Sequence, residues 1–233
     1  MDFSKDSFIN GEILLINKPA GWTSFQVVKK VRWLIKSSFK IKKIKVGHAG
    51  TLDPLAEGLL IICTGKLTKK IIEFQNKEKE YFGTFYLGAT TASFDLETPI
   101  KSRCSIKKIN FEKLNTATKK FTGTIQQTPP IYSAIKVKGK RLYEFARKGQ
   151  IVDLKKRKVT VSEFNITSVN LPHVDFKIKC SKGTYIRSIA NDFGQELEVG
   201  AYLHKLTRSS IGKFKLENAI TINDFEKIIK KLI

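Results

Sequence analysis

The sequence lacks any long uninterrupted apolar segment. Its longest such run, residues 59–63 (LLIIC), is far shorter than the roughly 20 residues that a membrane-spanning helix needs. The N-terminal stretch MDFSKDSFING has neither the charged region nor the apolar region of a secretory signal peptide. These two absences predict a protein of the cytosol.

Cysteine is also scarce, because the chain has only three, and no two of them form a C-x-x-C pair. An odd and scattered set (Cys63, Cys104, Cys180) excludes a disulfide framework and provides no pattern for a zinc site. We interpret them as three reduced thiols in or near the core. The G-x-x-x-x-G-K-[ST] spacing of a phosphate-binding loop is missing as well.

Acidic residues are few beside the basic ones, with 21 Asp+Glu against 43 Lys+Arg and a net charge of +22. A general lysine bias explains part of this excess, but the charges cluster. Residues 29–45 hold eight basic residues and no acid, and residues 136–158 hold ten basic residues against two acids. Aromatic side chains interleave with both stretches, a mixture that suits phosphate contacts and base stacking. We therefore favour a nucleic-acid partner over a membrane surface.

The chain has 233 residues and 41% apolar content, enough to fill one large core or two small ones. Strand and helix patterns are mixed without regular alternation, which predicts an α+β fold. Apolar or alternating runs predict strands around residues 12–18, 58–65, 80–88 and 174–180. Helical spacing of apolar residues predicts helices after Thr23, over 186–197 and over 222–233.

Residues 126–150 (QQTPPIYSAIKVKGKRLYEFARKGQ) have a different character. A Pro-Pro pair and two glycines occur here amid dense positive charge. We expect a basic, mostly loop-like insertion over about 124–152 that reaches for a ligand.

One aspartate, Asp53, stands in the glycine-containing stretch GHAGTLDPLAEGLL. Gly47 and Gly50 allow backbone turns that other residues disfavour, and Pro54 fixes the φ angle after the acid, so the loop is built to hold one side chain rigidly. Taken alone, an aspartate in a tight loop is more often a turn former or a helix cap than a catalyst. Asp53 and Glu57 together do not make the carboxylate cluster of a metal nuclease.

This stretch resembles the G-H-x-G-T-L-D-P-x-A-x-G-L-L signature of the TruB-type tRNA pseudouridine synthases. Other segments resemble that family in the same order: NKPAGWTS, KEYFGTFYLGATTASFD, PPIYSAIKVKGKRLYEFARKG and CSKGTYIRSIANDFG. The resemblance implies a pseudouridine synthase fold with a mixed, mainly antiparallel central sheet flanked by helices. It also implies isomerisation of uridine to pseudouridine at position 55 in the T loop of tRNA.

By this resemblance Asp53 is the essential catalytic aspartate. An ionised carboxylate could attack the sugar C1′, attack the base at C6, or remove a sugar proton, and the sequence leaves all three routes open. Arg187 in GTYIR is implied to pair with Asp53 through its planar guanidinium. The alternative for Arg187 is an ordinary surface residue at the start of a helix.

Further positions match family residues at the substrate. Tyr81 matches the tyrosine that stacks on the target base and assists the final proton transfer at C5. Tyr185 and Leu206 match positions that line the uridine pocket, and His48 matches a histidine near the flipped nucleotide. Lys18, which we expect to contact RNA, and Pro19 match a turn near the active site, where Asn17 departs from the more usual Asp.

The target base lies inside a folded RNA loop and must be turned out of its stack before a carboxylate can reach it. Basic residues of the insertion would grip the surrounding phosphates: Lys136, Lys138, Lys140, Arg141 and Arg147. An isomerisation needs neither redox chemistry nor an external group, so we expect no cofactor and no metal. The partner is then the T stem-loop of tRNA, bound by a monomer without an obligatory protein partner.

We expect a catalytic domain over residues 1–212 and a short helical tail over 213–233. A C-terminal RNA-binding domain of the PUA type, which relatives commonly carry, is not expected. Two alternatives remain: an RNA-guided pseudouridine synthase of ribonucleoprotein particles, which relies on that domain, and a non-catalytic RNA-binding or RNA-folding protein. Asp53, Tyr81 and Arg187 in their expected contexts argue against the latter.

Overall fold

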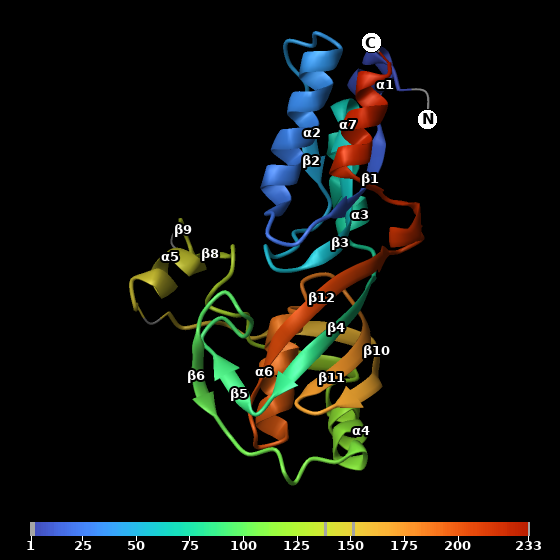
Figure 1. The fold of residues 1–233 in the computed structure, drawn as a ribbon. Coiled ribbons are helices and arrows are strands. Elements are labelled where there is room, and N and C mark those ends of the chain that lie inside the picture. The colour runs from blue at the N-terminus through green and yellow to red at the C-terminus, as the bar shows by residue number, and fades with distance from the viewer. Residues whose placement is uncertain (1–2, 138, 151, 233) are drawn as a thin grey trace. The chain divides into compact units, whose positions relative to one another are not determined.

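The computed structural model describes residues 3–137, 139–150 and 152–232. The chain forms two compact units, one from residues 1–81 and 206–233 and the other from residues 82–205 (Figure 1). The second unit is thus inserted into the sequence of the first. These boundaries differ from the predicted division at residue 212, because the C-terminal segment belongs to the same unit as the N-terminal segment.

The first unit is a small sheet covered by helices. Its helical elements are α1 (Lys5–Asn10), α2 (Ser24–Ser38), the 3₁₀ segment η1 (Gly65–Lys70), α3 (Ile71–Gln75), the 3₁₀ segment η2 (Leu216–Asn218) and α7 (Ile222–Lys230). Its strands are β1 (Ile13–Lys18), β2 (Val46–His48), β3 (Glu57–Thr64), β13 (Phe214–Lys215) and β14 (Ile220–Thr221). Strands β4 (Lys79–Leu87) and β12 (Ala201–Ile211) have residues in both units.

Helix α2 forms where its local signals predict it. The Thr23 side chain caps the helix by accepting from the Gln26 backbone N–H, and the Gln26 side chain in turn accepts from the Thr23 backbone N–H. One side of the helix is buried in the core of the first unit: Val27, Val28, Val31, Leu34 and Ile35. Helix α7 packs beside α2 and adds Phe225 and Ile229 to the same core. The predicted C-terminal helix is therefore part of this core.

The second unit places helices against a sheet with an aromatic core. Its other elements are β5 (Ala89–Thr91), β6 (Ile100–Arg103), α4 (Phe111–Lys120), β7 (Gly123–Gln127), β8 (Lys136–Val137), β9 (Lys140–Arg141), α5 (Leu142–Arg147), β10 (Arg157–Asn170), β11 (His173–Cys180) and α6 (Ile186–Glu196). The Phe85 and Phe176 rings stack at 4.1 Å between centroids, and Phe164 and Phe193 surround them. The predicted insertion thus contains a short hairpin and helix α5.

The strands form a ten-stranded sheet in the order β14-β1-β3-β12-β4-β11-β10-β7, with β13 pairing with β12 and β2 with β3. The pairs β1–β3, β2–β3, β10–β11 and β7–β10 are antiparallel, whereas β1–β14 and β3–β12 are parallel. The predicted α+β class with a mixed, mainly antiparallel sheet is confirmed. Among the described helices, none is long and apolar enough to cross a membrane.

Candidate active site

Asp53 lies in the connection between β2 and β3, which pair as antiparallel strands. The N–H of Ala49 donates to Ile61 O at 2.9 Å and closes the start of this connection. The Ala56 N–H donates to Asp53 O at 3.2 Å and closes its end. Asp53 is half-buried, whereas Leu52 before it is buried. The carboxylate therefore stands on a short loop anchored to a buried strand.

Arg208 on β12 holds the first half of this loop. Its guanidinium is buried, and its Nε donates to Leu59 O at 2.8 Å, its Nη2 to Gly50 O at 3.1 Å and its Nη1 to Thr51 O at 3.4 Å. One planar group thus joins strand β3 to the residues just before Asp53. No role for Arg208 was predicted from the sequence, because an isolated arginine in a strand pattern gives no local signal of what it contacts.

Lys18 and Ser24 bond to the residues on either side of Asp53. The Lys18 ammonium donates to Trp22 O at 2.6 Å, Pro19 O at 2.9 Å and Pro54 O at 3.4 Å. The Ser24 Oγ accepts from the Leu52 N–H at 2.8 Å and donates to Leu52 O at 3.0 Å. The residues on both sides of Asp53 are therefore fixed by groups of the β1–α2 turn.

The RNA-contacting role predicted for Lys18 is wrong. Its side chain is fully buried, and its ammonium donates hydrogen bonds to backbone carbonyl groups. The match of Lys18 and Pro19 to a turn near the active site does agree with this position. Lysine is exposed in most proteins, so the sequence pattern gave no reason to place this one inside.

The buried cations set the electrostatics of the loop. The pKa of Lys18 is lowered to about 8, chiefly by burial, which the Asp53 carboxylate opposes; Arg208 contributes to the lowering, and Glu57 opposes it. Burial and Arg208 also lower the pKa of His48, which makes a backbone hydrogen bond with Gly50. The His48 ring is therefore a neutral imidazole at neutral pH, and its predicted place near a flipped nucleotide stays a prediction.

The glycines of the loop serve two different purposes. Gly50 has φ +100°, which is the region that favours glycine, as predicted. The same prediction is wrong for Gly47, whose φ lies outside this region. A Cβ on Gly47 would instead lie 2.7 Å from Ile71 Cδ1, so glycine at this position allows the Ile71 side chain to pack closely against the backbone.

Tyr81 and Leu206 lie on neighbouring strands of the sheet, β4 and β12. Each side chain is 8% exposed, so both are mostly buried. This degree of burial suits a pocket wall and also suits a core position. Their roles at a uridine stay predictions.

Arg187 is the second residue of helix α6 in the second unit and is 3% exposed, so it is not a surface residue. Its Nε lies 3.5 Å from Asp95 Oδ2, its Nη1 donates to Ser93 O at 3.2 Å, and its Nη2 donates to Tyr132 O at 2.9 Å. The guanidinium thus joins the segment after β5 to the start of the basic insertion. Its predicted pairing with Asp53 involves residues of the two units and stays a prediction.

Tyr185 directly precedes α6 and is half-buried. Its N–H donates to Gln127 Oε1 at 2.8 Å, and its carbonyl accepts from Gln127 Nε2 at 3.1 Å. The sequence analysis did not single out Gln127 or Asp95. Both are buried polar residues whose partners are distant in sequence, so no local pattern reveals them.

The insertion is anchored at its base and exposed beyond it. Leu142 is fully buried and its N–H donates to Ile135 O at 2.8 Å. The side chains of Lys140, Arg141 and Arg147 are exposed, and the Arg147 guanidinium lies over the Tyr143 ring at 5.3 Å. Lys138 lies outside the described residues, as does the side chain of Lys136.

No group of three or more His, Cys, Asp or Glu side chains able to hold a metal ion occurs among the described residues. Cys63 and Cys180 are buried free thiols, as predicted, but Cys104 is exposed. Burial raises the pKa of the Cys63 thiol to about 11. This thiol is therefore protonated at neutral pH and unsuited to nucleophilic chemistry.

Comparison with known proteins identifies relatives over nearly the whole chain. The model of the TruB family pseudouridylate synthase (N terminal domain) matches residues 36–186. The tRNA pseudouridine synthase B of Flavobacterium johnsoniae is 51% identical over 226 residues, which cover 97% of this chain and 99% of the relative. That of Phocaeicola vulgatus is 49% identical over 219 residues, covering 94% of this chain and 93% of the relative.

Solved structures agree with these matches. A chain of a Cbf5-Nop10-Gar1 complex is 28% identical with a TM-score of 0.71, covering 97% of this chain but 56% of that one. A chain of an H/ACA RNP bound to a substrate RNA containing 2′-deoxyuridine is 26% identical with a TM-score of 0.67, covering 94% of this chain and 53% of that one. The predicted pseudouridine synthase fold is thus confirmed, and the chain belongs to the TruB family of pseudouridylate synthases.

Proposed function

We propose that this chain isomerises uridine to pseudouridine at position 55 in the T loop of tRNA, with Asp53 as the catalytic carboxylate. The observation that carries the proposal is the anchoring of the Asp53 loop by Arg208, Lys18 and Ser24 while Asp53 itself stays half-buried. Such preorganisation suits a carboxylate that must meet its substrate in one orientation. The names of relatives that are 51% and 49% identical support tRNA as the substrate.

The reaction conserves all atoms of the nucleotide. The bond between N1 and C1′ breaks, a bond between C5 and C1′ forms, C5 loses a proton, and N1 carries a proton in the product. No electron passes to another molecule, so we expect no redox or group-transfer cofactor and no resident metal. Attack at C1′, attack at C6 and removal of a sugar proton each require an ionised Asp53.

The other matched residues have supporting roles in this proposal. Tyr81 stacks on the target base and assists proton transfer at C5, and Tyr185 and Leu206 line the uracil pocket. Arg187 pairs with Asp53 and orients its carboxylate, and His48 occupies space near the nucleotide as a neutral ring. The burial of Tyr81, Leu206 and Arg187 supports roles inside a pocket rather than on an open surface.

The nucleotide must leave its stack before it can reach Asp53. In our proposal the basic insertion grips the phosphates around the T loop while the pocket recognises the base. The exposed side chains of Lys140, Arg141 and Arg147 support this role. The protein acts in the cytosol as a monomer, without a guide RNA or an obligatory protein partner.

Release of tritium tests the proposal, because C5 loses its hydrogen during isomerisation. Unmodified tRNA transcripts labelled with [5-³H]uridine are incubated with the purified protein alone. We expect release of one tritium per tRNA, and none from a transcript that carries cytidine at position 55. Failure to release tritium without added guide RNA would contradict the proposal and favour the RNA-guided alternative.

The first mutational prediction concerns Asp53. Asp53→Asn should abolish tritium release yet change the free energy of tRNA binding by less than about 1 kcal/mol, because the amide has nearly the same shape but cannot act as a carboxylate. The matched control is Glu57→Gln, an exposed carboxylate at the first position of β3, which should retain release. Turnover near the wild-type rate in Asp53→Asn would refute the assignment.

A further inference from the structure

The outward stripe of helix α2 has a composition that the fold does not require. Phe25, Lys29, Trp33 and Lys36 follow at helical spacing and share one side of the helix, away from the buried valines. Phe25 is 56% exposed and Trp33 is 57% exposed. Large aromatic side chains that are left more than half exposed on one stripe indicate a surface that contacts another molecule.

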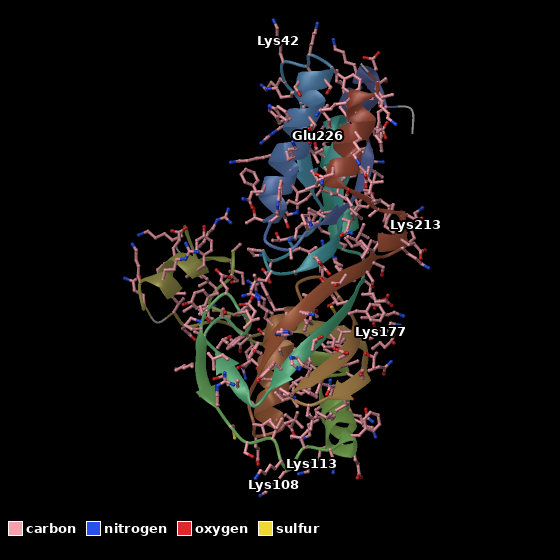
Figure 2. All side chains as sticks on the ribbon, in the orientation of Figure 1. Lys42, Lys108, Lys113, Lys177, Lys213 and Glu226 are labelled. Carbon is pink, nitrogen blue, oxygen red and sulfur yellow. The ribbon has the colours of Figure 1, made fainter. Side chains whose placement is uncertain are left out.

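The charge of this stripe is positive and mostly unbalanced. The Lys29 ammonium lies 4.9 Å from the centroid of the Phe25 ring, and that of Lys30 lies 4.8 Å from the Trp33 ring. Lys30 also pairs with Glu226 of α7 at 2.8 Å, and Figure 2 labels Glu226. Over the part of the chain that the structure describes, Lys29 and Lys36 have no acidic partner. The stripe therefore combines free ammonium groups with aromatic faces.

The stripe begins at the Asp53 loop. Ser24, the first residue of α2, bonds to Leu52, and the exposed Trp22 just before the helix accepts a hydrogen bond from Lys18 through its carbonyl. The Gly21 N–H donates to Pro54 O at 2.8 Å. From this end α2 extends for about 22 Å, at 1.5 Å per residue. A nucleic acid that presents a nucleotide to Asp53 has its neighbouring nucleotides within reach of α2.

We propose that the α2 stripe, defined as Trp22, Phe25, Lys29, Trp33 and Lys36, is a second RNA-binding surface. Its lysines bind phosphates and its aromatic rings stack on unpaired bases of the same RNA that presents the uridine, so the proposal rests on the proposed function. Charge complementarity identifies the occupant, because residues 29–45 contain eight basic residues and no acid. A membrane would need a wide exposed apolar face, whereas the apolar face of α2 is already buried.

Titration of tRNA binding against salt tests this surface. The double variant Lys29→Gln/Lys36→Gln should weaken binding on the order of tenfold at low salt and reduce the slope of log K against log[salt] by about one to two units. The matched control Lys213→Gln/Lys215→Gln removes the same charge from the β12–β13 hairpin of the same unit, where Figure 2 marks Lys213. The control should leave the slope unchanged.

Trp33 tests the stacking component separately. Trp33→Ala should weaken tRNA binding on the order of tenfold with little change in the salt slope, and Trp33→Phe should restore most of the affinity. Because the Trp33 ring is mostly outside the core, neither variant should change the thermal unfolding midpoint appreciably. Affinities of the double variant and Trp33→Ala equal to those of the control would overturn the proposal and assign the stripe to another partner.

Tritium release at saturating tRNA separates this inference from the proposed function. If the wild-type protein releases no tritium but the stripe variants lose affinity and slope as expected, the RNA-binding surface stands and the proposed function fails. If the wild-type protein releases tritium but the stripe variants bind like the control, the proposed function stands and the stripe proposal is refuted.

Discussion

At the scale of single residues, the Asp53 loop depends on two buried cations, Lys18 and Arg208. Burial of a charged group is costly unless polar partners replace the lost water. Here backbone carbonyl groups from the loop and its neighbouring turn act as those partners. Hydrocarbon side chains would hold a loop without the desolvation cost of a buried charge. The use of cations therefore indicates that the electrostatics and exact position of Asp53 matter.

Arg208 gives the second prediction. Arg208→Lys should lower the single-turnover rate on the order of tenfold to hundredfold, because a point charge cannot reach Leu59 O and Gly50 O together, as the planar guanidinium does. Binding of tRNA should change much less, since Arg208 is buried and acts through the loop. Rates at saturating tRNA and separate binding titrations measure the two effects. The exposed Arg103 provides the control, Arg103→Lys, and equal rates for the two variants would contradict a positioning role.

The third prediction concerns Lys18 and pH. Its folded-state pKa of about 8 lies below the ordinary value of 10.5, so between these values the unfolded state binds more protons than the folded state. The free energy of unfolding should therefore rise with pH across this window, while below pH 8 the folded state carries the full cost of the buried charge. Relative to Lys18→Met, the wild-type protein should gain on the order of 2 kcal/mol between pH 7 and pH 10.

Urea unfolding of both proteins at the two pH values gives this difference directly. The contributions of most other titrating groups to the free energy of unfolding cancel in this comparison, because both proteins contain those groups. A difference in free energy that stays constant with pH would show that Lys18 keeps its proton throughout the range.

Sequence alone identified Asp53 but not the residues that hold it. The signature around Asp53 is local, and a family resemblance can match it position by position. Arg208 and Ser24 act on backbone groups that are distant in sequence, and a carbonyl acceptor has no residue type that a pattern could detect. For the same reason the Arg187–Asp95 ion pair was not anticipated, although both residues stand in recognisable segments.

At the scale of elements, the pairing of β3 with β12 brings two backbones unusually close at Gly58. Gly58 has φ +106°, and a Cβ there would lie 2.5 Å from Arg208 O and 2.8 Å from Arg208 N. An alanine at this position must move the strand that carries Arg208. The glycine is therefore required by the approach of the strands as well as by its own backbone angle.

Gly58→Ala is the fourth prediction, and Gly21→Ala is its control. Gly21 also has a positive φ, +82°, but no atom lies within 4 Å of its would-be Cβ. Gly21→Ala should cost about 1 kcal/mol for backbone strain alone. Gly58→Ala should cost at least about 2 kcal/mol more, because overlap with a strand backbone adds to the strain. Chemical denaturation measures both, and equal losses would refute the close-approach argument.

Local periodicity predicted only some of the elements, and the long strands β10 and β12 were among those not predicted. Strand β1, helix α2 with its Thr23 cap, strand β11 and helix α6 all occur where alternation or helical spacing placed them. Strands β5 and β6 and the short hairpin of the insertion carry few apolar residues and were not predicted. Their backbone pairing and turns define them, so hydrophobic patterning contains little signal for them.

At the scale of the whole molecule, the net charge of +22 attracts a polyanionic substrate before any contact forms. Not all of this charge contacts RNA, since several lysines pair with acids on the surface, such as Lys177 and Lys179 with Glu163. The basic insertion differs from this surface of paired lysines, because its exposed Lys140 and Arg141 are adjacent residues of β9.

The fifth prediction follows from this charge. Lys140→Gln/Arg141→Gln should weaken tRNA binding and reduce the salt slope by about one unit for each lost phosphate contact. Single-turnover rates at saturating tRNA should stay much closer to wild type, because phosphate contacts position the RNA rather than perform the chemistry. The control in the same unit is Lys113→Gln/Lys119→Gln on α4. An unchanged slope in the insertion variant would make the insertion an ordinary solvated surface.

The division into two units was beyond sequence analysis. Composition does not change at residues 81 and 206, and both crossings occur within strands, β4 and β12, rather than in linkers. Patterns of glycine, proline and serine therefore gave no sign of either boundary. The fold class was accessible because strands and helices mix throughout the chain, but their grouping depends on long-range contacts.

The discontinuous first unit has a consequence for the order in which the protein is made. A ribosome synthesises residues 1–81 first, then residues 82–205 of the second unit, and only afterwards Arg208 and helix α7, which adds Phe225 and Ile229 to the core of the first unit. Arg208 therefore reaches the Asp53 loop only after the second unit has been synthesised, and until then the N-terminal segment lacks the guanidinium that bonds to Gly50 O and Thr51 O. The Asp53 loop can thus take its final arrangement only after the second unit has been synthesised, so the order of synthesis determines when this loop is held in place.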